Sequence, residues 1–207
     1  MANLSVDELL ELIGKCTDQR MFAMYEAIAR GVTLEKLHEI TKIDYFFLHK
    51  YLNLYNMECR LKEGNIDAET YLRAKKMGYP DKAIERLSGE KVPMHRDPVY
   101  KMVDTCAAEF AAETPYFYAT YDDENEAKEF LDERPKKPCV VVLGSGPIRI
   151  GQGIEFDYAS VHCVWMLKQA GYDVVMINNN PETVSTDFDT ADRLYFEPLT
   201  AEDVLGV

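Results

Sequence analysis

Hydrophobic residues recur at three- and four-residue spacing through the first ninety positions, which is the pattern of amphipathic helices. Polar residues suited to capping stand before several of these stretches, at Ser5, Thr33, Asp44 and Asp67. The predicted helices start at Ser5, near residue 17, and at Thr33, and then cover residues 44–64, 67–78 and 80–89. The pattern therefore predicts a helical bundle.

The helix after Asp44 carries more apolar side chains than one face can hide. Phe46, Phe47 and Leu48 are followed by further aromatic and aliphatic residues as far as Met57. Such a helix either lies at the centre of the bundle or contributes a contact surface. The sequence leaves both alternatives open.

The helical pattern breaks after Lys91, where prolines frame a loop. Short strands are predicted at residues 99–103 and 116–120, with a short helix at 105–112 between them. Charged residues then dominate positions 122–133, and prolines bound positions 135–138. We interpret residues 122–138 as a solvated linker.

Strand and helix patterns alternate from Cys139 onward. Strands are predicted at residues 139–143, 173–177 and 193–196, a helix at 156–170, and a further helix after the capping residue Thr200. This order is typical of βαβ units with a parallel sheet. The predicted fold is thus mainly an α-helical bundle (1–121), followed by the linker and a partial, Rossmann-like α/β domain (139–207).

Composition narrows the classes of function. The net charge is −13, so the chain lacks the positive surface of a nucleic-acid-binding protein. No apolar run approaches the length of a membrane span, and the start lacks a signal peptide, so we expect a cytoplasmic protein away from membranes. The five cysteines form no CxxC pair, which favours reduced thiols over a zinc site.

Two loops follow predicted parallel strands and so fall on one edge of the sheet, where α/β proteins place their sites. The first contains Gly144, Gly146, Ile148, Arg149, Ile150, Gly151 and Gly153 and leads to Glu155, and the second contains Asn178, Asn180 and Thr183. Glycines of this kind either bring backbone amides close to a ligand or simply build tight turns. A dinucleotide site is disfavoured, because Arg149 replaces its third glycine and Asn178 its ribose-binding carboxylate.

Residues 144–158, 178–187 and 192–198, together with 104–110, resemble the large chain of glutamine-hydrolysing carbamoyl phosphate synthetase. The strings from Gly144 to Tyr158 and from Asn178 to Asp187 carry most of the likeness. The resemblance implies an oligomerisation domain joined to a truncated pre-ATP-grasp domain, the start of the second, carbamoyl-phosphate-forming unit.

This resemblance implies an ATP-dependent ligase that makes carbamoyl phosphate, for arginine and pyrimidine synthesis, from bicarbonate, glutamine-derived ammonia and two ATP. The complete enzyme would use ATP with magnesium or manganese, bound beyond Val207, so neither ATP nor metal is expected on this fragment. No catalytic residue is assigned, and the two loops would border the carbamate passage. The implied partners are the glutaminase small chain and other large chains, with self-association through the helical domain. A non-catalytic helical interaction module with an α/β scaffold is the alternative.

Overall fold

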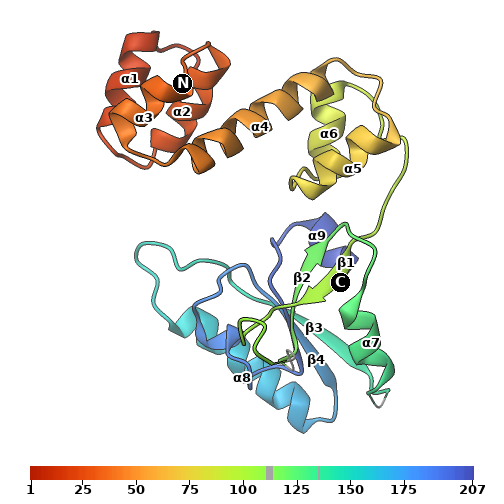
Figure 1. Cartoon of the computed structure of the whole chain (residues 1–207). Coiled ribbons are helices and arrows are strands. Elements are labelled where there is room, and N and C mark those ends of the chain that lie inside the picture. The colour runs from red at the N-terminus through yellow and green to blue at the C-terminus, as the bar shows by residue number, and fades with distance from the viewer. Residues whose placement is uncertain (111–113, 135) are drawn as a thin grey trace. The chain divides into compact units, whose positions relative to one another are not determined.

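The computed structural model describes residues 1–110, 114–134 and 136–207, with all their side chains except that of Glu129. The chain divides into two compact units, Met1–Met94 and His95–Val207 (Figure 1). A helical unit is followed by a unit built on a sheet, which confirms the predicted fold class. Each unit is described by itself below.

Six helices make up the first unit, and capping residues set where most of them begin. Ser5 and Glu8 form the predicted capping box, with the Glu8 amide donating to Ser5 Oγ at 3.2 Å and the Ser5 amide to Glu8 Oε2 at 2.7 Å. Thr33, Asp44 and Asp67 cap their helices as predicted. The bounds are α1 (Val6–Gly14), α2 (Arg20–Ala29), α3 (Leu34–Thr41), α4 (Tyr45–Lys62), α5 (Ala68–Lys76) and α6 (Asp81–Ser88).

Helix α4 belongs to two hydrophobic cores. Its first half contributes Leu48 to a core with α1, α2 and α3, and its second half contributes Met57 and Leu61 to a core with α5 and α6. At its first turn, Phe46 and Phe47 remain 60% and 57% exposed. Both sequence alternatives therefore hold for α4: it is central to the unit, and it also presents an apolar surface.

A buried ion pair joins α5 to α6. The Lys75 side chain is only 2% exposed, and its Nζ lies 3.0 Å from Asp81 Oδ1. Tyr71, fully buried, donates from its hydroxyl to the same oxygen at 2.9 Å. Asp81 also stands in the first turn of α6, where the helix dipole favours a negative charge. One carboxylate thus compensates a buried ammonium group and a buried phenol.

Replacing Asp81 by alanine should destabilise the first unit by about 3–5 kcal/mol, because the buried Lys75 ammonium and the buried Tyr71 hydroxyl both lose their bonds to this carboxylate. Urea unfolding followed by the helical circular dichroism signal measures this loss. The fluorescence of Trp165, the single tryptophan and a residue of the second unit, serves as an internal reference. Glu11→Ala removes the exposed pair with Lys15 and should cost under about 1 kcal/mol. Equal losses in the two variants would contradict the prediction.

Among the described residues of the second unit, five strands form one sheet in the order β1-β2-β5-β4-β3. The strands are β1 (Val99–Met102), β2 (Tyr116–Thr120), β3 (Cys139–Leu143), β4 (Asp173–Ile177) and β5 (Arg193–Tyr195). Strands β2 to β5 pair in parallel, whereas β1 is antiparallel to β2. The sheet is therefore mixed at one edge rather than wholly parallel.

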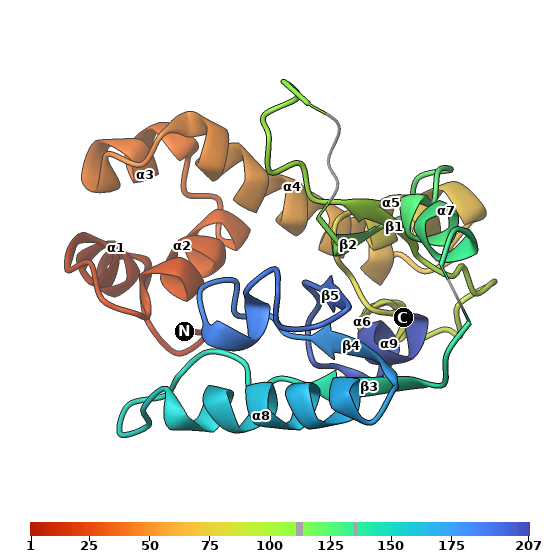
Figure 2. The ribbon, with the colours of Figure 1, turned by 90° about the horizontal axis from the view of Figure 1, so that it is seen from below.

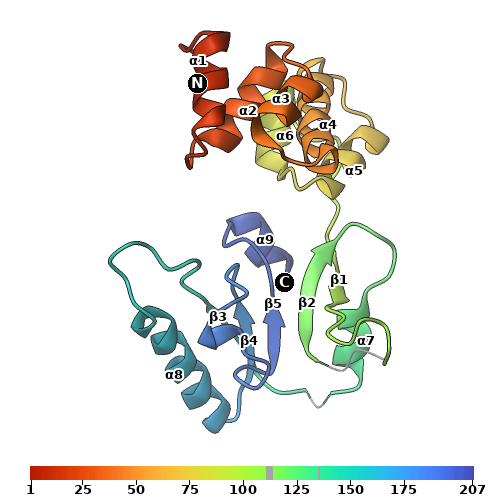
Figure 3. The ribbon, with the colours of Figure 1, turned by 60° about the vertical axis from the view of Figure 1, so that its left-hand side comes forward.

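Helices cover both faces of this sheet (Figures 2 and 3). On one face, Val164 of α8 (Glu155–Gln169) packs with Val174, Met176 and Leu194. On the other face, the core around Phe117 and Tyr195 also includes residues of α7 (Glu126–Asp132) and α9 (Ala201–Gly206). This layered packing buries β4 on both sides and leaves β3 at the edge of the sheet.

The division between the units lies far from the predicted linker. Strands β1 and β2, assigned from the sequence to the helical domain, join the sheet of the second unit. Within the predicted linker, α7 forms and packs against the sheet core through Ala127 and Phe130. Three apolar residues in a charged stretch, Ala127, Phe130 and Leu131, give too weak a periodic signal to reveal a packed helix.

The short helix predicted at 105–112 is absent from its described part. Residues 105–110 form bends and turns, with Ala107 and Ala108 in the left-handed region at φ of 52° and 60°. The predicted helix was wrong there, and Ala111 and Ala112 lie outside the described residues. Asp104 accounts for the local turn, since its carboxylate accepts from the amides of Cys106 and Ala108.

Two sequence expectations concern properties of the whole chain. In the part of the chain that the structure describes, no helix combines the length and the apolar character needed to cross a membrane. Each of the five cysteines is a free thiol, as the spacing predicted.

Candidate functional site

The two predicted site loops start side by side at the carboxyl edge of the sheet. Strands β3 and β4 pair in parallel with Leu143 opposite Ile177, so their following residues, Gly144 and Asn178, are neighbours. The Gly144 amide extends the pairing by donating to the Ile177 carbonyl at 2.8 Å. The expectation that both loops share one edge is met.

Asn178 connects the loops from a fully buried position. Its Oδ1 accepts from the amides of Gly146 at 3.2 Å and Asn180 at 3.3 Å, and its Nδ2 donates to Ser185 Oγ at 3.1 Å. A Cβ atom added to Gly144 would lie 2.8 Å from Asn178 Cβ. Glycine is therefore required at 144 by the close approach of the asparagine side chain.

Asp157 forms the second connection, and it was not among the predicted site residues. Its side chain is buried in the first turn of α8 and accepts three hydrogen bonds of 2.7 Å, from Thr183 Oγ1, the Ser185 amide and Ser185 Oγ. The signal that would have revealed it is its spacing from Val161 and Val164. These three residues fall on the buried face of α8, so the carboxylate needs partners within the fold.

The outer part of the glycine loop extends away from these connections. Residues 149–152 make a turn in which the Gln152 amide donates to the Arg149 carbonyl at 3.0 Å. Ile150 is fully exposed, and Ile148 is 46% exposed. Figure 3 shows this loop projecting beyond the sheet ahead of α8. The two isoleucine side chains of this loop are thus open to solvent within the second unit.

Gly153 and Glu155 meet where the loop enters α8. A Cβ atom on Gly153 would lie 2.9 Å from Glu155 Cδ, so the Glu155 carboxylate folds over the glycine. The backbone of Gly153 lies outside the left-handed region, unlike that of Gly146 (φ 72°) and Gly151 (φ 86°). A side chain at 153 would therefore be opposed by a movable carboxylate rather than by backbone strain.

The structure thus brings only some of the predicted residues together. The connected group comprises Gly144, Gly146, Asn178, Asn180 and, through Asp157, Thr183. Gly153 and Glu155 lie at the start of α8, while Ile148, Arg149, Ile150 and Gly151 belong to the outer turn. The glycine loop thus has an anchored base and an exposed arm.

A further buried carboxylate, Glu197, follows β5 at the same edge. It is 6% exposed, and its Oε1 accepts from the Ala119 amide of β2. Burial is the main cause that raises the pKa of Glu197 to about 7, with the nearby charge of Asp203 adding to it and the bond from Ala119 opposing it. Burial, followed by the charge of Glu197, likewise raises the pKa of the Tyr100 hydroxyl.

The Glu197 carboxyl should make the second unit less stable as pH rises from about 5 to about 8. Its folded-state pKa lies above the ordinary value of 4.5, so the folded chain holds a proton that the unfolded chain has lost. Glu197→Gln keeps the acceptor for Ala119 and removes the titration. Relative to the native chain, the variant should gain about 2–3 kcal/mol over this pH range.

Urea unfolding followed by Trp165 fluorescence at the two pH values measures that gain. Glu182→Gln is the matched control, because Glu182 is exposed and has no such buried environment. If Glu197→Gln and Glu182→Gln showed the same pH dependence as the native chain, the assignment would be wrong.

The two loops carry few of the groups that bind metal ions or nucleotide phosphates. No group of three or more His, Cys, Asp or Glu side chains that could hold a metal ion occurs among them. Both oxygens of Asp157 already accept hydrogen bonds within the fold. The two loops contain no lysine, and Arg149 is their single cation. We therefore assign no step through ATP or magnesium to these residues.

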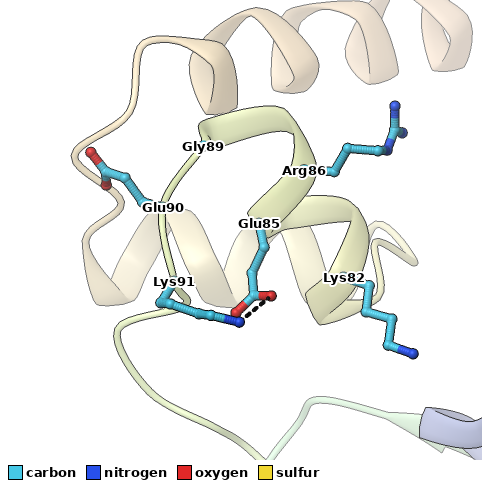
Figure 4. A pocket seen from close by; sticks show the side chains of 6 residues that line it. All are labelled: Lys82, Glu85, Arg86, Gly89, Glu90 and Lys91. Carbon is cyan, nitrogen blue, oxygen red and sulfur yellow. Dashed lines mark hydrogen bonds and ion pairs between the residues drawn. The ribbon is translucent and has the colours of Figure 1, made fainter.

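The first unit has a shallow depression at the end of α6, lined by Lys82, Glu85, Arg86, Gly89, Glu90 and Lys91 (Figure 4). Lys91 Nζ pairs with Glu85 Oε2 at 3.2 Å, and the Lys91 side chain is 90% exposed. Such solvated charges do not make a site.

Two parts of the chain match known families. Residues 1–102 match the family described as the carbamoyl-phosphate synthetase large chain, oligomerisation domain. Residues 136–207 match the carbamoyl phosphate synthase preATP-grasp domain, and this range holds both site loops. The chain therefore belongs to the carbamoyl phosphate synthetase large-chain family, with an oligomerisation domain followed by a pre-ATP-grasp domain.

Proposed function

We propose that this chain serves the ligase that makes carbamoyl phosphate from bicarbonate, glutamine-derived ammonia and two ATP. Its first unit would associate large chains, and its glycine loop would border the carbamate passage into the second synthetase unit. The observation that carries the proposal is the glycine loop, anchored at its base to the Asn178 loop and exposed along its arm, inside the pre-ATP-grasp match.

The chemistry of the arm suits a small, labile anion. Ile148 and Ile150 offer apolar surface, while Arg149 and Glu155 contribute opposite charges nearby in the sequence. Apolar walls exclude water, and a fixed positive charge attracts an anion without trapping it. The exposed arm would form a wall of the passage when another segment of the complete enzyme covers it.

In this proposal ATP and its metal ion bind to another part of the complete enzyme. The glutaminase small chain is a partner of that complete enzyme. That nucleotide would supply the phosphoryl groups. The residues of this chain would line the passage, orient the carbamate and exclude water. They would take no part in phosphoryl transfer.

Gly153→Phe in the complete enzyme should block the passage. The backbone at 153 accepts a side chain, so the ring would displace the Glu155 carboxylate and occupy the loop rather than unfold it. Bicarbonate-dependent ATP hydrolysis should remain near normal, while carbamoyl phosphate formation should fall at least about tenfold. Gly153→Ala is the control and should retain most of the coupling. A folded Gly153→Phe enzyme with the normal ratio of product to ATP would refute the passage role.

The first turn of α4 is the proposed contact between chains. The rings of Phe46 and Phe47 lie 5.3 Å apart and are both exposed, and Lys50 Nζ lies 4.7 Å from the centre of the Phe46 ring. Exposed aromatic residues beside a cation are typical of protein interfaces. The match to an oligomerisation domain supports this assignment.

Replacing Phe46 and Phe47 by serine should weaken self-association of the chain by about ten- to thirtyfold, the usual effect of truncating central aromatic residues. Sedimentation equilibrium over a wide concentration range measures it. Phe188→Ser removes an equally exposed ring from the second unit and should change nothing. A native chain that stays monomeric at every concentration would contradict the prediction.

The alternative function is a non-catalytic interaction module whose α/β unit is only a scaffold. It predicts the same self-association through α4. It differs in predicting that Gly153→Phe leaves the coupling of the complete enzyme unchanged, so one experiment separates the two.

A further inference from the structure

We infer that Asp157 is a positioning residue that fixes the Asn178 loop against the start of α8, so that both loops bordering the proposed passage move as one body. The inference rests on the proposed function for the importance of these loops, and on the hydrogen bonds of Asp157 for the coupling itself.

The geometry joins segments that are distant in sequence. Asp157 accepts from Thr183, 26 residues further on, and twice from Ser185, 28 residues further on. All three bonds measure 2.7 Å, and Asp157 and Ser185 are each 1% exposed. Bonds of this kind to a buried carboxylate are stronger than neutral ones, so the two segments are held rigidly.

The connection continues to the other end of the loops. Ser185 Oγ donates to Asp157 and accepts from Asn178 Nδ2, and Asn178 Oδ1 accepts from the Gly146 amide. One buried chain of hydrogen bonds thus runs from the entry of the glycine loop, through the Asn178 loop, to the helix that the glycine loop enters. Neither loop can shift alone without breaking a buried bond.

Simple helix capping does not explain Asp157. A carboxylate in the first turn is favoured by the helix dipole, but an exposed one would serve equally well. The N-cap of helix α8, Ile154, makes no side-chain cap bond, and the three bonds of Asp157 all go to the Asn178 loop.

Amide hydrogen exchange of the 207-residue chain tests the coupling. Asp157→Asn should raise exchange in residues 144–154 and in 178–187 by about tenfold, while the strands of the sheet keep their native rates. Asp187→Asn makes the same substitution at an exposed residue of the Asn178 loop and should leave both loops unchanged. Native exchange in the loops, or an equal rise throughout the second unit, would overturn the inference.

If Asp157→Asn fails to fold, Ser185→Ala provides a milder test. It removes the hydroxyl that links Asp157 to Asn178 and keeps the bond from the Ser185 amide. Exchange should again rise in both loops together. A rise in the Asn178 loop alone would overturn the inference, because the glycine loop would then be positioned independently.

The complete enzyme then separates this inference from the proposed function. With Asp157→Asn, the ATP hydrolysed per carbamoyl phosphate formed should rise about threefold or more as the passage loosens, and with Asp187→Asn it should not. If the loops loosened while the coupling stayed normal, the inference about Asp157 would stand and the passage role would be refuted. Lost coupling with native exchange in both loops would refute the positioning.

Discussion

The second unit depends on the requirement that buried polar groups be hydrogen-bonded. Asp157, Asn178 and Ser185 lie at the carboxyl edge of the sheet with almost no access to water. Each would be costly there alone, and together they satisfy one another and the backbone amides of both loops. This mutual dependence explains the close approach that excludes a side chain at Gly144. It also explains how a loop with an exposed, glycine-rich arm keeps a defined base.

The first unit is organised by a different constraint, the length of α4. With 18 residues this helix is long enough to serve two cores, one with three preceding helices and one with two following helices. Sharing this helix couples the two small hydrophobic cores. The same helix starts with two exposed phenylalanines, so the surface proposed for association is supported by the most central element of the unit.

Each unit thus combines a buried anchor with an exposed surface. The glycine loop is anchored by buried bonds and presents Ile148, Arg149 and Ile150 outward, and α4 is anchored by Leu48 and presents its aromatic turn. In a member of the carbamoyl phosphate synthetase large-chain family, outward surfaces of this kind are suited to contacts with the remainder of the enzyme. Rigid anchoring is what such contacts need, since a loosely held loop cannot offer a defined surface to its partner.

The sequence by itself determined the helices with capping residues, the three parallel strands after residue 138, the shared edge of the two loops and the family. These features depend on local signals: periodicity, caps and strings of consecutive residues. It did not reveal that β1 and β2 complete the sheet, that α7 packs where a linker was expected, or that Asp157 joins the loops. Only the tertiary structure decided these points, because each depends on partners that are distant in sequence. A strand of four residues or a single carboxylate carries no local mark of the partner that it will meet.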